Sequence, residues 1–176
     1  MRFTRWWLLS GTALVLSIAV GCTSGDLGPV GPSEATTELA TLDPVDPLPT
    51  LSLLSCSPQR YLTATSVVGP KGGKIKVGSH VLTIPAGALS ADVTIVAEQL
   101  TGSVNSVRFG PEGLTFAVPA ALTMSYTNCM TVVLPKSVVY TDERLKVLEL
   151  LQSVDKAQTK TVTSPIDHFS RYAVAY

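Results

Sequence analysis

The chain has no excess of charge of either sign, because 13 lysines and arginines stand against 13 aspartates and glutamates. A nucleic-acid-binding domain needs a basic patch, so this balance argues against a nucleic-acid partner. Histidine is also scarce: only His80 and His168 occur, and neither lies at ligand spacing from a cysteine. Zinc sites built from cysteine and histidine need such spacing. We therefore expect no metal and no cofactor.

Long apolar runs are absent after the first 21 residues. The uncharged run from 6 to 20 is itself short for a spanning helix, which needs about 20 apolar residues. It follows Arg2 and Arg5 and ends with Gly21 before Cys22. A basic start, an apolar middle and a small residue at the end are the parts of a secretory leader. We predict that residues 1–21 are a signal peptide and that the mature chain is exported.

The stretch AVGC at 19–22 resembles the lipobox of bacterial lipoproteins, with Ala19 where leucine is usual. The resemblance implies that Cys22 becomes the new amino terminus and carries palmitate-type acyl chains, so that the membrane itself is a partner. Thr23 follows the cysteine, and the absence of aspartate there implies the outer membrane if the source has two. The expected location is the bacterial cell envelope, outside the cytoplasm. Plain secretion is the alternative.

Five prolines and no apolar periodicity mark the next segment, and we predict a flexible tether over residues 22–54. The alternative is an ordered arm packed on the domain. The prolines are Pro29, Pro32, Pro44, Pro47 and Pro49.

Short runs of β-forming residues separated by glycine and proline fill residues 55–176. In ADVTIVAEQL, Val93, Ile95 and Ala97 share one face, and in ALTMSYT, Leu122 and Met124 do so. Period two is typical of half-buried strands. Many short strands with closely spaced turns predict one all-β domain, an antiparallel β-sandwich.

Residues 141–153 admit two interpretations. Thr141, two acids and leucines three apart are a fair helix signature. A strand with Leu145, Val147, Glu149 and Leu151 on one side, followed by a turn at 155–156, fits equally well. We favour the strand because a lone helix has no obvious place in this pattern.

Two cysteines remain once Cys22 is assigned to lipid. In an oxidising compartment, Cys56 and Cys129 are most simply a disulfide. Two buried thiols or a metal site are the alternatives.

One family resembles the stretch from 66 to 176. Gly72-Gly73, the IPAGAL sequence at 84–89 and the Gly110-Pro111 segment are similar to the ZU-five domain of zonula occludens proteins, netrin receptors and ankyrins. The resemblance implies an antiparallel β-sandwich that acts as an interaction or scaffold module.

The same superfamily directs attention to His168, Phe169 and Ser170. Related domains in death-domain proteins and inflammasome sensors cleave themselves at His-Phe-Ser. The resemblance would make Ser170 the nucleophile on the Phe169 carbonyl, activated by His168. In an ordinary last strand, His168 and Ser170 would instead share a polar face while Phe169 enters the core.

Other chemistry has less support in the sequence. The acids Asp92, Glu98, Asp142 and Glu143 are scattered rather than paired for glycoside hydrolysis. Sugar binding would need exposed aromatic side chains, and both tryptophans lie in the leader. We therefore expect a lipid-anchored module without catalysis, with an unidentified envelope protein as a further partner. Self-cleavage between Phe169 and Ser170, or carbohydrate binding, is the alternative.

Overall fold

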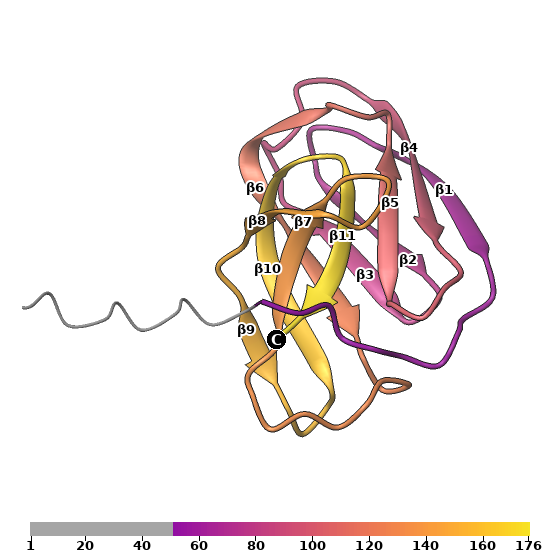
Figure 1. Ribbon diagram of the computed structural model, residues 1–176. Helices are drawn as coiled ribbons and strands as arrows, with labels where there is room; N and C mark the ends of the chain where they lie inside the picture. The colour runs from indigo at the N-terminus through magenta and orange to yellow at the C-terminus, as the bar shows by residue number, and fades with distance from the viewer. Residues whose placement is uncertain (1–50) are drawn as a thin grey trace, which may run out of the picture. The chain divides into compact units, whose positions relative to one another are not determined.

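Within residues 51–176, the alternating apolar residues form eleven strands in two antiparallel sheets (Figure 1). The computed structural model describes residues 51–176. The predicted signal peptide, Cys22 and most of the predicted tether lie outside the described residues. No helix occurs between residues 51 and 176, and hence none that could cross a membrane.

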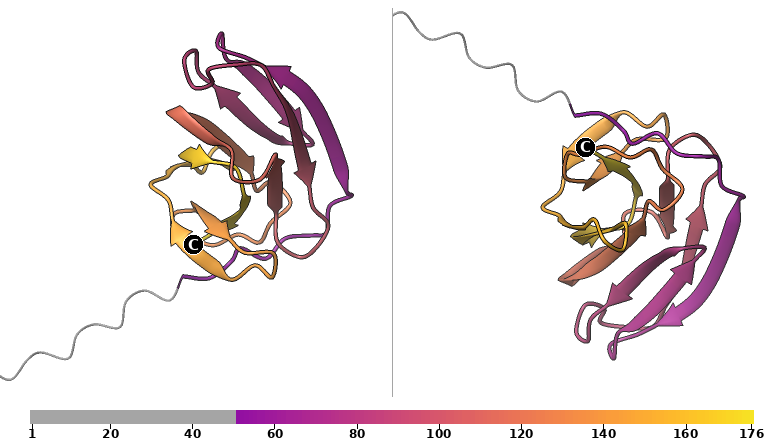
Figure 2. Two further views of the ribbon diagram at one scale, coloured as in Figure 1. Left: turned by 90° about the horizontal axis from the view of Figure 1, so that it is seen from above. Right: turned by 90° about the horizontal axis from the view of Figure 1, so that it is seen from below.

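The first sheet has six strands, in the order β1 (Leu62–Val68), β4 (Val93–Gln99), β5 (Ser106–Gly110), β11 (Arg171–Ala175), β7 (Ser137–Thr141) and β8 (Val147–Leu150). The second has five, in the order β2 (Gly73–Val77), β3 (His80–Ile84), β6 (Thr115–Ser125), β10 (Thr161–His168) and β9 (Val154–Lys156). The end-on views in Figure 2 place the amino-terminal strands β1 and β2 on one side and the carboxy-terminal strands on the other.

The core lies between the two sheets and is built from the alternating residues that the sequence indicates. Ile95 and Ala97 of β4 are fully buried while Thr94 beside them is exposed, and Leu122 and Met124 of β6 are fully buried. β4 and the second half of β6 therefore cover the core with every second side chain. The predicted all-β sandwich is confirmed.

The folded part begins before the predicted boundary at residue 55. Ser52 and Tyr176 exchange backbone hydrogen bonds of 3.1 and 3.0 Å, and the Leu54 N–H donates to Val174 at 2.8 Å. This arm enters beside the carboxy terminus (Figures 1 and 2). The Leu54 side chain is fully buried in the core. Because of the prolines before them, residues 51–54 were expected to belong to the tether. They pack on the sandwich instead, because their leucines bury apolar surface.

The segment from 141 to 153 contains no helix, and β8 occupies its second half. The Asp142 carboxylate accepts the backbone N–H groups of Arg144 and Lys146, both at 2.8 Å. Leu145 has a φ of 63°, which a right-handed helix does not allow. The side chains that resemble a helix start therefore close a β7–β8 turn. The preference for a strand is confirmed over Val147–Leu150, whereas Leu145 lies in the turn and Leu151 follows the strand.

The turn expected at residues 155–156 lies further along the chain, after β9 (Val154–Lys156). Asp155 and Lys156 belong to β9, and the turn follows at 157–160. Lys160 takes the left-handed φ of 49° that closes it, and its N–H donates to Ala157 at 3.3 Å. The expected turn position was wrong because Asp155 is held by long-range hydrogen bonds from the Tyr126 hydroxyl and the Lys136 N–H.

Candidate functional site

The His168-Phe169-Ser170 motif lies where the chain crosses from one sheet to the other. β10 of the five-stranded sheet ends at His168, and β11 of the six-stranded sheet begins at Arg171. The motif is therefore not part of one continuous last strand, contrary to the simpler expectation. Phe169 does enter the core, since its side chain is 1% exposed.

The backbone of this crossover is fixed on both sides. The Phe169 N–H donates to Leu114 at 2.7 Å, and its carbonyl accepts the Gly113 N–H at 3.2 Å. Gly113 has a φ of 76°, a conformation that favours glycine, so this residue type lets the loop present its N–H. The Ser170 carbonyl accepts the Phe109 N–H at 3.1 Å. The peptide between Phe169 and Ser170 is thus held by two neighbouring segments.

The side chains do not form the arrangement that nucleophilic attack requires. His168 Nδ1 lies 3.5 Å from the Phe169 carbonyl oxygen, and within residues 51–176 no hydrogen bond joins it to the Ser170 hydroxyl. A serine nucleophile needs a base on its hydroxyl, whereas donors that stabilise an oxyanion lie at the carbonyl oxygen. His168 occupies the second kind of position, together with the Gly113 N–H.

A disulfide joins Cys56 to Cys129, 73 residues further along the chain, as the sequence predicts. Its surroundings tie the amino-terminal arm to the rest of the domain. The Cys56 N–H donates to Ser103 at 2.7 Å, and the Met130 N–H donates to Ser55 at 2.9 Å. The arm is therefore bonded covalently to the segment that follows β6.

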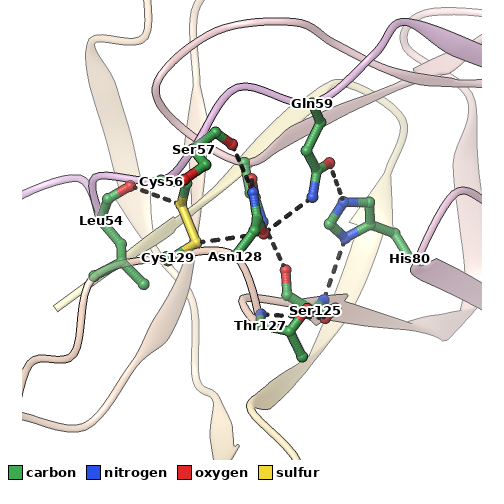
Figure 3. The surroundings of a disulfide bond; sticks show 10 residues. Leu54, Cys56, Ser57, Gln59, His80, Ser125, Thr127, Asn128 and Cys129 are labelled. Carbon is green, nitrogen blue, oxygen red and sulfur yellow. Dashed lines mark hydrogen bonds between the residues drawn. A yellow bond between two sulfur atoms is a disulfide. The ribbon is translucent and has the colours of Figure 1, made fainter.

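Asn128, next to the disulfide, is the centre of a polar network (Figure 3). Its amide nitrogen donates to the Ser57 carbonyl at 2.7 Å and to Asn105 at 3.1 Å. Its amide oxygen accepts hydrogen bonds from Asn105 at 2.8 Å and from Gln59 at 3.1 Å. Every polar atom of the Asn128 side chain is satisfied, which is the condition for stable burial of polar groups. The network therefore adds to the disulfide in holding residues 57–59 on the domain.

His80 extends this network into the core, where its side chain is fully buried. The Ser125 N–H donates to Nδ1 at 3.2 Å, and Nε2 lies 3.4 Å from the Gln59 side-chain oxygen (Figure 3). These partners fix the neutral tautomer with hydrogen on Nε2. Burial lowers the pKa of His80 to about 4. A structural role fits this position, and the local sequence contains no signal for the network because its members come from four distant segments.

We expect the stability of the domain to fall as the pH drops from 6.5 to about 4. The pKa of His80 is lower in the folded chain than in the unfolded chain, so the unfolded state binds the additional proton in this window and is favoured there. The stability is fully present above pH 6.5, and the loss reaches about 3 kcal/mol at the acidic end. Urea unfolding of the native chain and of the His80→Gln variant at several pH values measures it. Equal pH slopes in the two proteins would contradict the prediction.

Two of the acids that are scattered in the sequence meet at Arg108 on the exposed side of the six-stranded sheet. Arg108 pairs in register with Glu98 of β4 and Arg171 of β11. Its guanidinium lies 2.7 Å from the Glu98 carboxylate and 3.2 Å from that of Glu143. The sequence alone does not predict this cluster. Glu98 and Arg108 are brought together by the register between β4 and β5, and Glu143 reaches them from the β7–β8 turn. The hydrogen bond from Arg108 lowers the pKa of Glu98, which is the opposite of what a general acid needs.

Among residues 51–176, no group of three or more histidine, cysteine, aspartate or glutamate side chains could hold a metal ion. Tyr61, which hydrogen-bonds Glu98, is the only exposed aromatic side chain in that part of the molecule.

No protein-family model matches the chain, and no curated protein matches it. A functional assignment therefore depends on the sequence itself and on the arrangement of residues 51–176.

Proposed function

We propose that this chain is a bacterial lipoprotein whose β-sandwich, similar to the ZU-five type, acts without catalysis as an interaction or structural module of the cell envelope. Acyl chains on Cys22 attach it to the membrane, on the side away from the cytoplasm. The outer membrane is the location if the source has two. An unidentified envelope protein is the proposed second partner, and no nucleic acid or small-molecule cofactor takes part.

The disulfide is the observation that carries this proposal. Disulfides such as Cys56–Cys129 form and persist in oxidising compartments and are rare in the cytosol. The bond also fixes the arm that connects the domain to the proposed tether and signal peptide. The leader and Cys22 in the sequence support the same location independently.

Replacing Cys22 is expected to abolish membrane attachment. Each buried methylene of an acyl chain contributes about 0.8 kcal/mol, so the loss of two or three chains removes the anchor. Metabolic palmitate labelling of the native chain and the Cys22→Ala variant, with fractionation of the cells, measures both label and location. The Cys56→Ala/Cys129→Ala variant is the matched control and should keep its label. Unchanged label and membrane retention in Cys22→Ala would refute the anchor, and crosslinking in the native envelope would identify the attached partner.

Self-cleavage between Phe169 and Ser170 is the second candidate. The observation that favours it is the Phe169 carbonyl oxygen, which accepts one N–H bond from Gly113 and lies 3.5 Å from His168 Nδ1. The long incubation of purified protein, followed by measurement of its mass, separates the two candidates. A module without catalysis stays one polypeptide, whereas a self-cleaving one gives two fragments that the Ser170→Ala variant does not give.

A further inference from the structure

The loop of residues 126–136, between β6 and β7, turns apolar side chains to the outside. Met130 is 63% exposed, Leu134 57% and Val133 fully exposed. No residue from 127 to 135 is charged. In Figure 1 this β6–β7 loop lies at the lower end of the sandwich, with the β9–β10 turn.

Several polar groups of the β6–β7 loop are bonded to the rest of the domain or within the loop. Asn128 is satisfied by the network beside the disulfide, and the Met130 N–H donates to Ser55. The carbonyls of Val132 and Leu134 both accept hydrogen bonds from the Lys136 ammonium, the first at 2.8 Å. A segment that enters a bilayer must satisfy its backbone groups internally, since lipid tails offer no partner. The Val132 and Leu134 carbonyls meet this condition, while the N–H groups of residues 131–134 make no hydrogen bond within residues 51–176.

Lys136, at the end of the loop, fixes this conformation through its buried side chain. Its side chain is buried, with 4% exposed, and its ammonium lies 5.7 Å from the centre of the Tyr126 ring. The Lys136 N–H donates to Asp155 at 2.9 Å, and the Tyr126 hydroxyl donates to the same carboxylate at 2.6 Å. Burying an ammonium is costly unless it is bonded and compensated. The loop therefore has a defined conformation in which Met130, Val133 and Leu134 remain exposed.

The arm that continues toward Cys22 joins the domain at this loop. Ser55 bonds Met130, and Cys56 is covalently linked to Cys129. Only 32 residues lie between Cys22 and Ser55. Even fully extended, they span at most about 115 Å. Lys160, on the β9–β10 turn, lines the same hollow as Met130 and Leu134 and places a cation beside them.

We infer that the β6–β7 loop inserts Met130, Val133 and Leu134 into the boundary between headgroups and acyl chains of the bilayer. The inference rests on the membrane attachment proposed above. It adds an orientation, with the end of the sandwich that carries the disulfide lying against the membrane. The occupant is a lipid surface rather than a protein, because three exposed, uncharged aliphatic side chains on a loop beside the arm that leads to Cys22 match what a bilayer boundary accepts.

A single tryptophan on the loop tests the inference in the full chain. Trp6 and Trp7 are the only tryptophans, so the triple variant Trp6→Phe/Trp7→Phe/Val133→Trp carries one fluorophore, on the loop. The matched control has Val67→Trp instead, on β1, where the native side chain is 63% exposed. Both are reconstituted into phosphatidylcholine vesicles with brominated acyl chains. A loop that enters the outer 5–10 Å of the bilayer should lose at least about half its emission, while the control keeps most of it.

A third variant adds Met130→Ser and Leu134→Ser to the loop reporter and should lose most of the quenching. Equal emission from positions 133 and 67 in vesicle-bound protein would overturn the inference and leave the anchor intact. Crosslinking of the loop to an envelope protein without quenching would also overturn it, since the occupant would then be a protein. A chain that does not stay with the vesicles contradicts both the attachment and the orientation. Retention on the vesicles tests the attachment, and quenching tests the orientation. Failure of one can therefore be told from failure of the other.

Discussion

Replacing Cys56 and Cys129 together by alanine is expected to lower the free energy of unfolding by roughly 4 kcal/mol. The bond closes a loop with a sequence separation of 73 residues, and the chain-entropy model assigns a large stabilisation to a loop of that length. Without the bond, the unfolded chain gains conformational freedom that the folded chain does not. The arm also loses its covalent link to the segment after β6, although its backbone hydrogen bonds to residues 174 and 176 remain.

Urea unfolding of the native and double-alanine proteins measures this loss as a shift of the midpoint at constant slope. The Cys22→Ala variant is the control, because Cys22 takes no part in the bond, and its domain should unfold like the native one. A double-alanine protein with a loss below about 1 kcal/mol would show that the bond contributes little beyond an ordinary surface contact.

Truncation of Phe169 is the second large effect, with an expected loss of about 3–5 kcal/mol for Phe169→Ala, the range found for buried phenylalanines. The ring stacks on Phe109 at a centroid distance of 5.4 Å and meets the edge of Phe116 at 5.1 Å. It lies at the crossover between the sheets, so its removal leaves a cavity that both sheets border. The surrounding rings cannot all move to fill it.

The neighbouring Ser170→Ala variant is the matched control, because the serine is only half-buried and its change should stay within about 0.5 kcal/mol. Phe169→Leu should fall between the two. Thermal and urea unfolding of all three proteins measure the series. If Phe169→Ala is no worse than Ser170→Ala, the crossover is not part of the core.

Local alternation was enough to predict the sheets. Val93, Ile95 and Ala97 on one face of β4 required no knowledge of their partners, because period two places them together whatever strand lies beside them. The pairing of Cys56 with Cys129 came from counting cysteines, since only one pair remained after Cys22. Both predictions depended on local pattern or composition alone.

The features that the sequence did not predict depend on contacts between distant residues. Whether Thr141 and its neighbours begin a helix was undecided locally, and the hydrogen bonds of Asp142 within the β7–β8 turn decide it. The Glu98–Arg108 pair depends on the register between β4 and β5, which no single strand contains. The sequence predicted burial of Phe169 correctly but not the change of sheet after His168, because a strand and a crossover have the same alternation over three residues.

The intact mass of the protein isolated from the membranes of its source tests the central claim most directly. Our account predicts a chain that begins at Cys22, carries acyl chains on that residue, contains the Cys56–Cys129 disulfide and is uncut between Phe169 and Ser170. A chain with an unmodified Cys22, or with free thiols at positions 56 and 129, would contradict the account.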